Sequence, residues 1–107
     1  MREKLEKLLA QGRDSALLRF GLGDACLKEH DAGQAALHLA QATQQQAGYS
    51  AAWKLLGKAL QQLGRLDEAQ AAWTTGVTVA QQQGDLQAVK EMTVFLKRLQ
   101  KQQQAAE

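Results

Sequence analysis

The sequence predicts an all-α fold of about six antiparallel helices. Proline is absent from its 107 residues, and residues that favour helices, such as Ala, Leu, Gln, Lys and Glu, dominate the composition. Apolar residues recur at helical spacing, and glycines or short polar residues interrupt this pattern. The links between the segments are short, which makes consecutive helices antiparallel neighbours. A chain of this length is expected to form one domain over residues 1–107.

The first three helices are expected between glycine or polar breaks, over residues 2–10, 15–29 and 32–47. Leu5, Leu8 and Leu9 share one face of the first helix, as in an amphipathic capping helix. Ser15 and Asp31 are good N-cap residues for the next two, because a short polar side chain can accept a hydrogen bond from a free amide of the first turn.

The last three helices are expected over residues 50–63, 67–83 and 85–104. Ser50 and Asp85 are placed as N-caps, and Asp67 stands at a helix start, where the helix dipole favours a carboxylate. Trp53 and Trp73 lie on the apolar faces of the fourth and fifth helices. These helices are therefore expected to supply much of the core.

A 34-residue shift aligns the chain with itself. The segment LGDACLKEHDAGQAALHLAQA falls on LGKALQQLGRLDEAQAAWTTG, which pairs Leu22 with Leu56, Gly23 with Gly57, Ala35 with Ala69 and Leu39 with Trp73. A glycine inside a helix costs about 1 kcal/mol relative to alanine. Its recurrence predicts that two helices approach closely there, with the two alanines as complementary small residues on the facing helices.

The second unit, residues 50–83, resembles a tetratricopeptide repeat, through Trp53, Leu56, Gly57, Leu60, Ala69 and Trp73. The first unit, residues 16–49, fits less well, since Arg19 replaces the usual tryptophan and Cys26 the usual tyrosine. The resemblance implies a short right-handed superhelix of two helix-turn-helix repeats between capping helices at 1–12 and 85–104. Glu91 stands where a third repeat would have its glycine, which favours a cap for the last helix.

The same resemblance implies a non-catalytic protein-binding module, of adaptor, scaffold or co-chaperone type, that holds a partner peptide or helix in a concave groove. The expected groove residues are Phe20, Asp24, Leu27, Lys28, Lys54, Lys58, Gln61, Met92 and Phe95. For Phe20, Met92 and Phe95 the alternative is that they are core residues. Some family members clamp a partner's C-terminal carboxylate with Lys and Asn, but Phe20, Asp24 and Leu55 stand at three clamp positions here, so that kind of capture is not expected.

A homodimer joined through the terminal helices is the alternative function. Repeat arrays commonly need about three units, and two repeats between helical caps can leave apolar surface that self-association would cover.

Other classes find little support in the sequence. A net charge of +2, from 13 basic and 11 acidic residues, gives no reason to expect nucleic acid or a membrane as partner. Because the N-terminal stretch is charged, we expect no leader peptide. We therefore expect a cytoplasmic location. The spacing of Cys26, His30 and His38 is not that of metal ligands. We expect Cys26 to lie in the core and His38 on an exposed face. No catalytic residue, metal or cofactor is expected.

Overall fold

The computed structural model describes residues 1–105 and contains six helices in that range. They are α1 (Arg2–Ala10), α2 (Ala16–Lys28), α3 (Ala32–Gln45), α4 (Ser50–Gln62), α5 (Leu66–Gln83) and α6 (Leu86–Ala105). This confirms the all-α fold, and each helix begins and ends within a few residues of its expected bounds.

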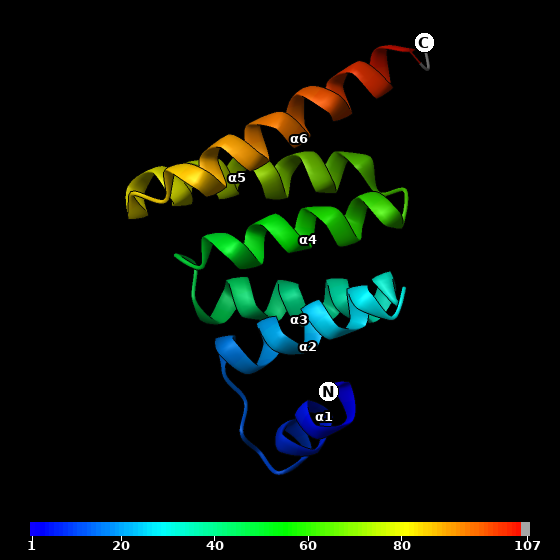
Figure 1. Ribbon diagram of the computed structural model, residues 1–107, viewed down its shortest axis with the longest axis vertical. Coiled ribbons are helices and arrows are strands. Elements are labelled where there is room, and N and C mark those ends of the chain that lie inside the picture. Colours follow the sequence, from blue (N-terminus) through cyan, green and yellow to red (C-terminus); the bar gives the residue numbers. More distant parts are fainter. Residues whose placement is uncertain (106–107) are drawn as a thin grey trace.

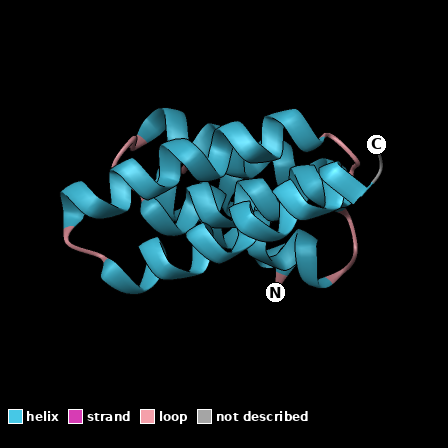
Figure 2. Ribbon diagram, turned by 90° about the horizontal axis from the view of Figure 1, so that it is seen from above, coloured by secondary structure: helices cyan, strands magenta, loops and turns pink. Residues whose placement is uncertain are grey.

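The helices stack along the long axis of a molecule that measures 46 × 30 × 18 Å, with the two termini at opposite ends (Figure 1). Viewed from above, the helices run roughly side by side and the loops gather at the two ends (Figure 2). Consecutive helices pack as antiparallel pairs from α2 to α6, whereas α1 touches only α2.

The helices from α2 to α6 form two layers. In the first, which we call the inner layer, α4 touches both α2 and α6. In the second, the outer layer, α3 and α5 do not approach each other at the level of the backbone. Because one layer is closed and the other is spread, the stack curves toward α2, α4 and α6. We therefore call the inner layer the concave side.

Three of the expected N-caps form. Ser15 Oγ accepts from the Leu18 amide at 3.1 Å, Asp31 Oδ1 from Gln34 at 3.2 Å, and Asp85 Oδ1 from Ala88 at 3.1 Å. Each bond satisfies one of the free amides of a first helical turn.

The expected cap at Ser50 is wrong. Ser50 is already the first residue of α4, and Tyr49 precedes it without a side-chain cap. The Ser50 hydroxyl instead donates to Asp85 Oδ2 at 2.9 Å, so it ties the start of α4 to the start of α6. Asp67 lies within the first turn of α5, where the helix dipole favours its charge.

The repeated glycines lie where two helices approach closely, as predicted. The residues that face them, however, are not the predicted alanines. A β-carbon on Gly23 would overlap the side chain of Leu39, and one on Gly57 would overlap the ring of Trp73. Ala35 and Ala69 are fully buried, yet the groups that occupy the space over the glycines are these two large side chains. Each glycine therefore admits a large residue of the neighbouring helix.

The largest fully buried side chains are Trp73, Leu22, Leu39, Met92, Leu99 and Cys26. Burial of Trp73 and Cys26 confirms their expected place in the core. Among the helices of residues 1–105, none combines the length and apolar character needed to cross a membrane.

Candidate functional site

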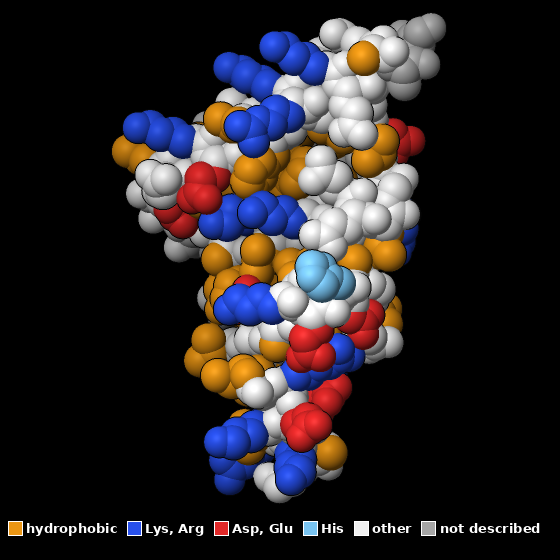
Figure 3. All heavy atoms as spheres, turned by 45° about the vertical axis from the view of Figure 1, so that its right-hand side comes forward, with side chains coloured by type: hydrophobic (Ala, Val, Ile, Leu, Met, Phe, Trp, Pro, Cys, Tyr) orange, Lys and Arg blue, Asp and Glu red, His pale blue; other side chains and the backbone are white. Residues whose placement is uncertain are grey.

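The nine expected groove residues all lie on the three helices of the inner layer, but they do not form one surface. Four come from α2, three from α4 and two from α6. Lys and Arg side chains gather over α4 and α6, with hydrophobic side chains exposed between them (Figure 3).

The junction of α4 and α6 is held by charged and aromatic contacts. Lys54 Nζ lies 3.1 Å from Glu91 Oε2, and the Lys54 side chain is only 23% exposed. One turn further along α4, Lys58 Nζ lies 4.9 Å from the centre of the Phe95 ring, within the range of a cation–π contact. We call these four residues, Lys54, Lys58, Glu91 and Phe95, the α4–α6 patch.

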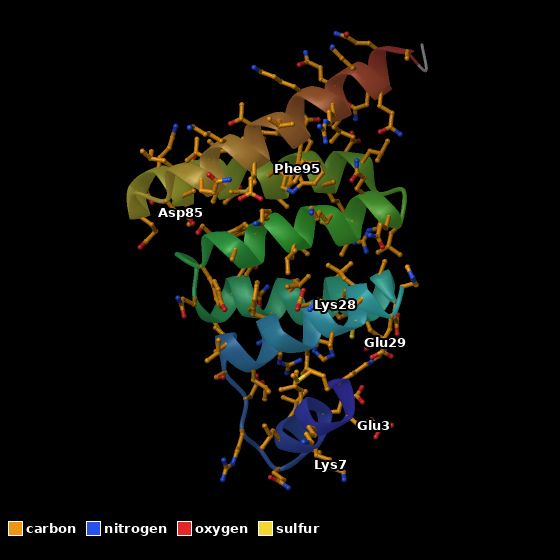
Figure 4. The ribbon with its side chains drawn as sticks, in the orientation of Figure 1. Glu3, Lys7, Lys28, Glu29, Asp85 and Phe95 are labelled. Carbon is orange, nitrogen blue, oxygen red and sulfur yellow. The ribbon has the colours of Figure 1, made fainter. Side chains whose placement is uncertain are left out.

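The α4–α6 patch rests on Trp73 of α5. The Phe95 ring packs against the Trp73 ring with centroids 5.2 Å apart, and Figure 4 places Phe95 between α6 and α5. The Trp73 Nε1 group donates to the backbone carbonyl of Lys54 at 3.0 Å. The indole can reach that carbonyl because Gly57, three residues further along α4, has no side chain. The repeat glycine thus positions the backbone that carries Lys54.

Met92 does not belong to an open surface. Its side chain is 0% exposed, and its sulfur and methyl group fill the space beside Gly76. The expectation that Met92 lines the groove is wrong, because the missing side chain of Gly76 lets it enter the core. It supports the α4–α6 patch from beneath.

On α2, Phe20 stacks on Tyr49, with ring centroids 4.9 Å apart and planes 26° apart. Tyr49 lies in the loop before α4 and is half-buried, and this burial raises the pKa of its hydroxyl. The repeat pattern says nothing about Tyr49, since it falls outside the signature positions. Leu27 packs partly buried against the core, and Gln61 is half-buried near the end of α4.

Asp24 and Lys28 lie apart from the α4–α6 patch. They form an ion pair of 3.0 Å, one turn apart on α2. Both line an apolar hollow of ≈ 680 Å³ between α1 and α2, together with Met1, Leu5, Leu8, Arg13, Ser15, Leu17, Leu18, Gly21, Ala25 and Glu29. The expected groove is therefore divided between two surfaces of the molecule.

Helix α1 is held across this hollow by charged groups. Arg2 Nη2 lies 3.0 Å from Asp31 Oδ2, and Arg2 Nη1 lies 3.6 Å from Glu29 Oε1. Backbone bonding from Gln34 and then the Arg2 contact lower the pKa of Asp31. Figure 4 shows Glu3 and Lys7 on α1, and Glu29 at the end of α2.

Arg19, the residue that replaces the repeat's tryptophan, joins a polar cluster. It donates to both carboxylate oxygens of Asp14 at 2.8 Å, and Gln45 donates to the same carboxylate at 3.0 Å. These bonds hold the pKa of Asp14 far below its usual value. The cluster ties the α1–α2 linker to α2 and α3.

The fourth member of this cluster is His38, which is half-buried rather than exposed as expected. Arg19 Nη1 lies 3.2 Å from His38 Nδ1. Because an arginine stays protonated, this ring nitrogen must accept the bond. Burial, and then the nearby charge of Arg19, lower the pKa of His38, so the ring is neutral.

Within residues 1–105, no three His, Cys, Asp or Glu side chains are grouped so that they could hold a metal ion. Burial raises the pKa of the Cys26 thiol, which keeps it in the unreactive protonated form.

Comparison with known proteins gives consistent matches. Residues 27–92 match the family model described as tetratricopeptide repeat. A TPR repeat-containing protein from Pseudomonas aeruginosa is 56% identical over 99 residues, which cover 92% of this chain and 94% of that protein.

Two solved structures extend the comparison. The solution structure of a Bordetella parapertussis protein is 45% identical, with a TM-score of 0.82 over 95% of this chain and 89% of that one. The crystal structure of a tetratricopeptide repeat domain protein from Salinibacter ruber has a TM-score of 0.76 at 22% identity, over 81% of this chain and 97% of that one. The last likeness supports the fold alone.

Proposed function

The chain belongs to the tetratricopeptide repeat family, a family of protein-interaction modules, and from this premise we propose that its α4–α6 patch binds a partner peptide or helix. In this role the protein is a non-catalytic adaptor, scaffold or co-chaperone-like module of the cytoplasm. The observation that carries the proposal is the presence of two partly buried lysines and an aromatic ring in one patch on the concave side.

The α4–α6 patch offers both charge and apolar area. Lys58 lies over the Phe95 ring, and within residues 1–105 no carboxylate lies within 4.0 Å of its amino group. Lys54 is paired with Glu91, and an acidic side chain of a partner can take the place of that glutamate. Both lysines are held in position, so less side-chain freedom is lost on binding than with mobile surface lysines.

The chemistry of the partner follows from this arrangement. An amphipathic, weakly acidic peptide would set carboxylates against Lys54 and Lys58 and an apolar side chain against Phe95. The stacked rings of Phe20 and Tyr49 lie on the neighbouring α2 and the loop before α4, where they can extend the apolar part of the contact.

The proposal is tested by reversing the two charges. The Lys54→Glu, Lys58→Glu double variant should lose partner capture, and circular dichroism would show that it remains folded without the Lys54–Glu91 ion pair. A photo-crosslinker at Gln61, in a pull-down from the source cell followed by mass spectrometry, would identify what binds at the α4–α6 patch.

The matched control is Lys97→Glu with Lys101→Glu, which makes the same change in net charge on exposed residues of α6. This variant should retain the crosslinked partners. Equal capture by the two double variants would contradict the proposal, since a surface that works through Lys54 and Lys58 cannot tolerate their reversal.

The second candidate function is a homodimer through the terminal helices. One specific observation favours it, the apolar hollow between α1 and α2, with Leu17 73% exposed on its rim. The charged residues at the same rim, Arg13, Asp24, Lys28 and Glu29, would have to give up water in such a contact, which weakens this alternative.

A further inference from the structure

The outer layer differs from the inner layer in charge. Helix α3 contains no Asp, Glu, Lys or Arg, and α5 contains none after Glu68. A protein surface ordinarily carries about 25–35% charged residues. Loss of charged residues marks the buried centre of a protein–protein interface, so this side of the molecule has the composition of a contact surface.

A groove runs along this side because α3 and α5 do not touch. It has a volume of ≈ 390 Å³, its walls carry the small residues Gly33, Ala36, Ala40, Ala71 and Ala72, and its floor is made by Trp53, Leu56 and Leu60 of α4. The only charged residues that line it are Arg65 and Glu68, which are paired with each other at 2.8 Å. The groove can therefore accept an apolar side chain without stripping water from an unpaired charge.

Leu37 stands beside this groove. It belongs to the lining residues, yet 65% of it is exposed. We define the α3–α5 face as six exposed, uncharged residues of the two helices. Four of them line the groove, Gly33, Leu37, Ala71 and Thr75, and the other two are Gln44 and Thr78. A projecting leucine and a groove of matching character thus lie next to each other on one face.

Two of the hydroxyl groups of α5 are suited to burial. The hydroxyl of Thr74 donates to the Gln70 carbonyl at 2.8 Å, and that of Thr78 donates to the Thr74 carbonyl at 3.4 Å. Their hydrogen-bond donors are therefore already used within α5. A glutamine amide carries both donors and an acceptor, so a face with glutamines can pair with a copy of itself.

We propose that the α3–α5 face binds a second copy of this chain, with Leu37 of each subunit inserted into the groove of the other. A two-fold interface uses the same patch on both subunits and must be complementary to itself, which an adjacent leucine and groove provide. Apart from the Arg65–Glu68 ion pair, this side is uncharged, and it is matched by an equally uncharged copy of itself. This contact leaves the inner layer open and is independent of the proposed peptide binding.

The expected affinity follows from the size of the face. Helices of 14 and 18 residues are roughly 21 and 27 Å long, and two of them side by side are about 20 Å wide. The face is thus on the order of 500 Å² per subunit, or about 1,000 Å² for both, which is at the lower limit of specific interfaces. The dimer is therefore weak and depends on concentration.

Sedimentation of the full chain from about 10 μM to 1 mM, a range that covers weak association, tests the proposal. The mass of the wild type should rise from 11.7 kDa toward twice that value. Leu37→Asp and Ala71→Glu, on opposite walls of the groove, should each stay at 11.7 kDa throughout. Unchanged circular dichroism would show that both remain folded.

The matched control is Leu17→Asp, which places the same charge on a similarly exposed leucine at the α1–α2 hollow. It should associate as the wild type does. A wild type that stays monomeric at about 1 mM, association that persists in either α3–α5 variant, or association lost in Leu17→Asp would each overturn the proposal. The last result would assign self-association to the terminal helices.

Discussion

The indole ring of Trp73 occupies the space in which a β-carbon of Gly57 would lie. Thirty-four residues earlier, Leu39 has the same relationship to Gly23. A repeat of this kind needs its in-helix glycine because a large side chain of the neighbouring helix fills that position. In the second repeat this side chain also donates a hydrogen bond to the backbone of Lys54, so the packing of the core and the position of the α4–α6 patch depend on one contact.

Gly57→Ala should destabilise the protein although alanine is the better helix former. The gain in helix propensity is about 1 kcal/mol, but the new methyl group overlaps the Trp73 ring, which is fully enclosed. Overpacking of this kind typically costs about 1–3 kcal/mol, so we expect a net loss of up to about 2 kcal/mol. Urea denaturation followed by circular dichroism measures it.

Gly33→Ala is the matched control for this variant. Gly33 also lies within a helix, but an added β-carbon there meets only Asp31 Oδ1, at 4.0 Å. This variant should gain stability, by up to about 1 kcal/mol. If both alanine variants were stabilised equally, the close approach of Trp73 to Gly57 would be contradicted.

Trp73→Ala should remove a large part of the total stability. The side chain is 1% exposed, and truncation of a buried tryptophan typically costs about 3–5 kcal/mol out of a total of about 5–15 kcal/mol. The midpoint temperature of thermal unfolding should fall by more than about 10 °C. A shift of only a degree or two would show that the contacts of Trp73 contribute little.

The fold could be predicted largely because its signals are local. Glycines with positive φ end three helices, at Gly12, Gly64 and Gly84, and short polar residues begin others. The 34-residue period then pairs the helices. The sequence around Ser50 fits an N-cap, but its hydroxyl donates to Asp85, 35 residues away. Such a contact leaves no local pattern in the sequence.

The candidate site could be predicted only in part. The period assigns each residue to the correct helix, but it does not say how deep a side chain lies. Met92 and Phe95 are three residues apart on α6, yet only Met92 enters the core completely, because Gly76 opens a space for it. Tyr49 has no counterpart in the repeat signature, so its stacking on Phe20 could not be expected from the pattern.

His30→Gly should stabilise the protein. His30 has φ of +61° and follows the end of α2, where the Asp31 amide bonds to the Cys26 carbonyl at 2.8 Å and the His30 amide to that of Leu27 at 3.1 Å. This is a Schellman motif, whose left-handed position favours glycine. In the second repeat, 34 residues later, Gly64 holds the same position, with φ of +75°.

The expected gain for His30→Gly is about 1 kcal/mol, the strain that a left-handed residue with a side chain carries. Gly64→Ala should lose a similar amount, and thermal unfolding measures both. A glycine at position 30 that lowered the stability would indicate that the imidazole makes a contact that outweighs its backbone strain.

His38 should make the stability depend on pH in the neutral to mildly acidic range. The groups around its ring are Arg19 and, through it, Asp14, with Arg2 and Glu6 of α1 further away. Burial and Arg19 lower the pKa of His38 from its ordinary value of 6.5, so the unfolded chain binds a proton more readily than the folded one. Neutral His38 therefore makes its full contribution to the free energy of unfolding above pH 6.5. This contribution is lost progressively as the pH falls toward the lowered pKa, and below that pKa it does not change further.

Urea unfolding of the wild type and His38→Gln between about pH 7.5 and 5 measures this effect, in a range where the carboxylates stay ionised. The wild type should lose stability as the pH falls, and His38→Gln should lose less. The nitrogen chemical shifts of His38 provide a direct check. A neutral ring that accepts a hydrogen bond from Arg19 through Nδ1 carries its proton on Nε2. A proton on Nδ1 would contradict this contact, from which the pH dependence follows.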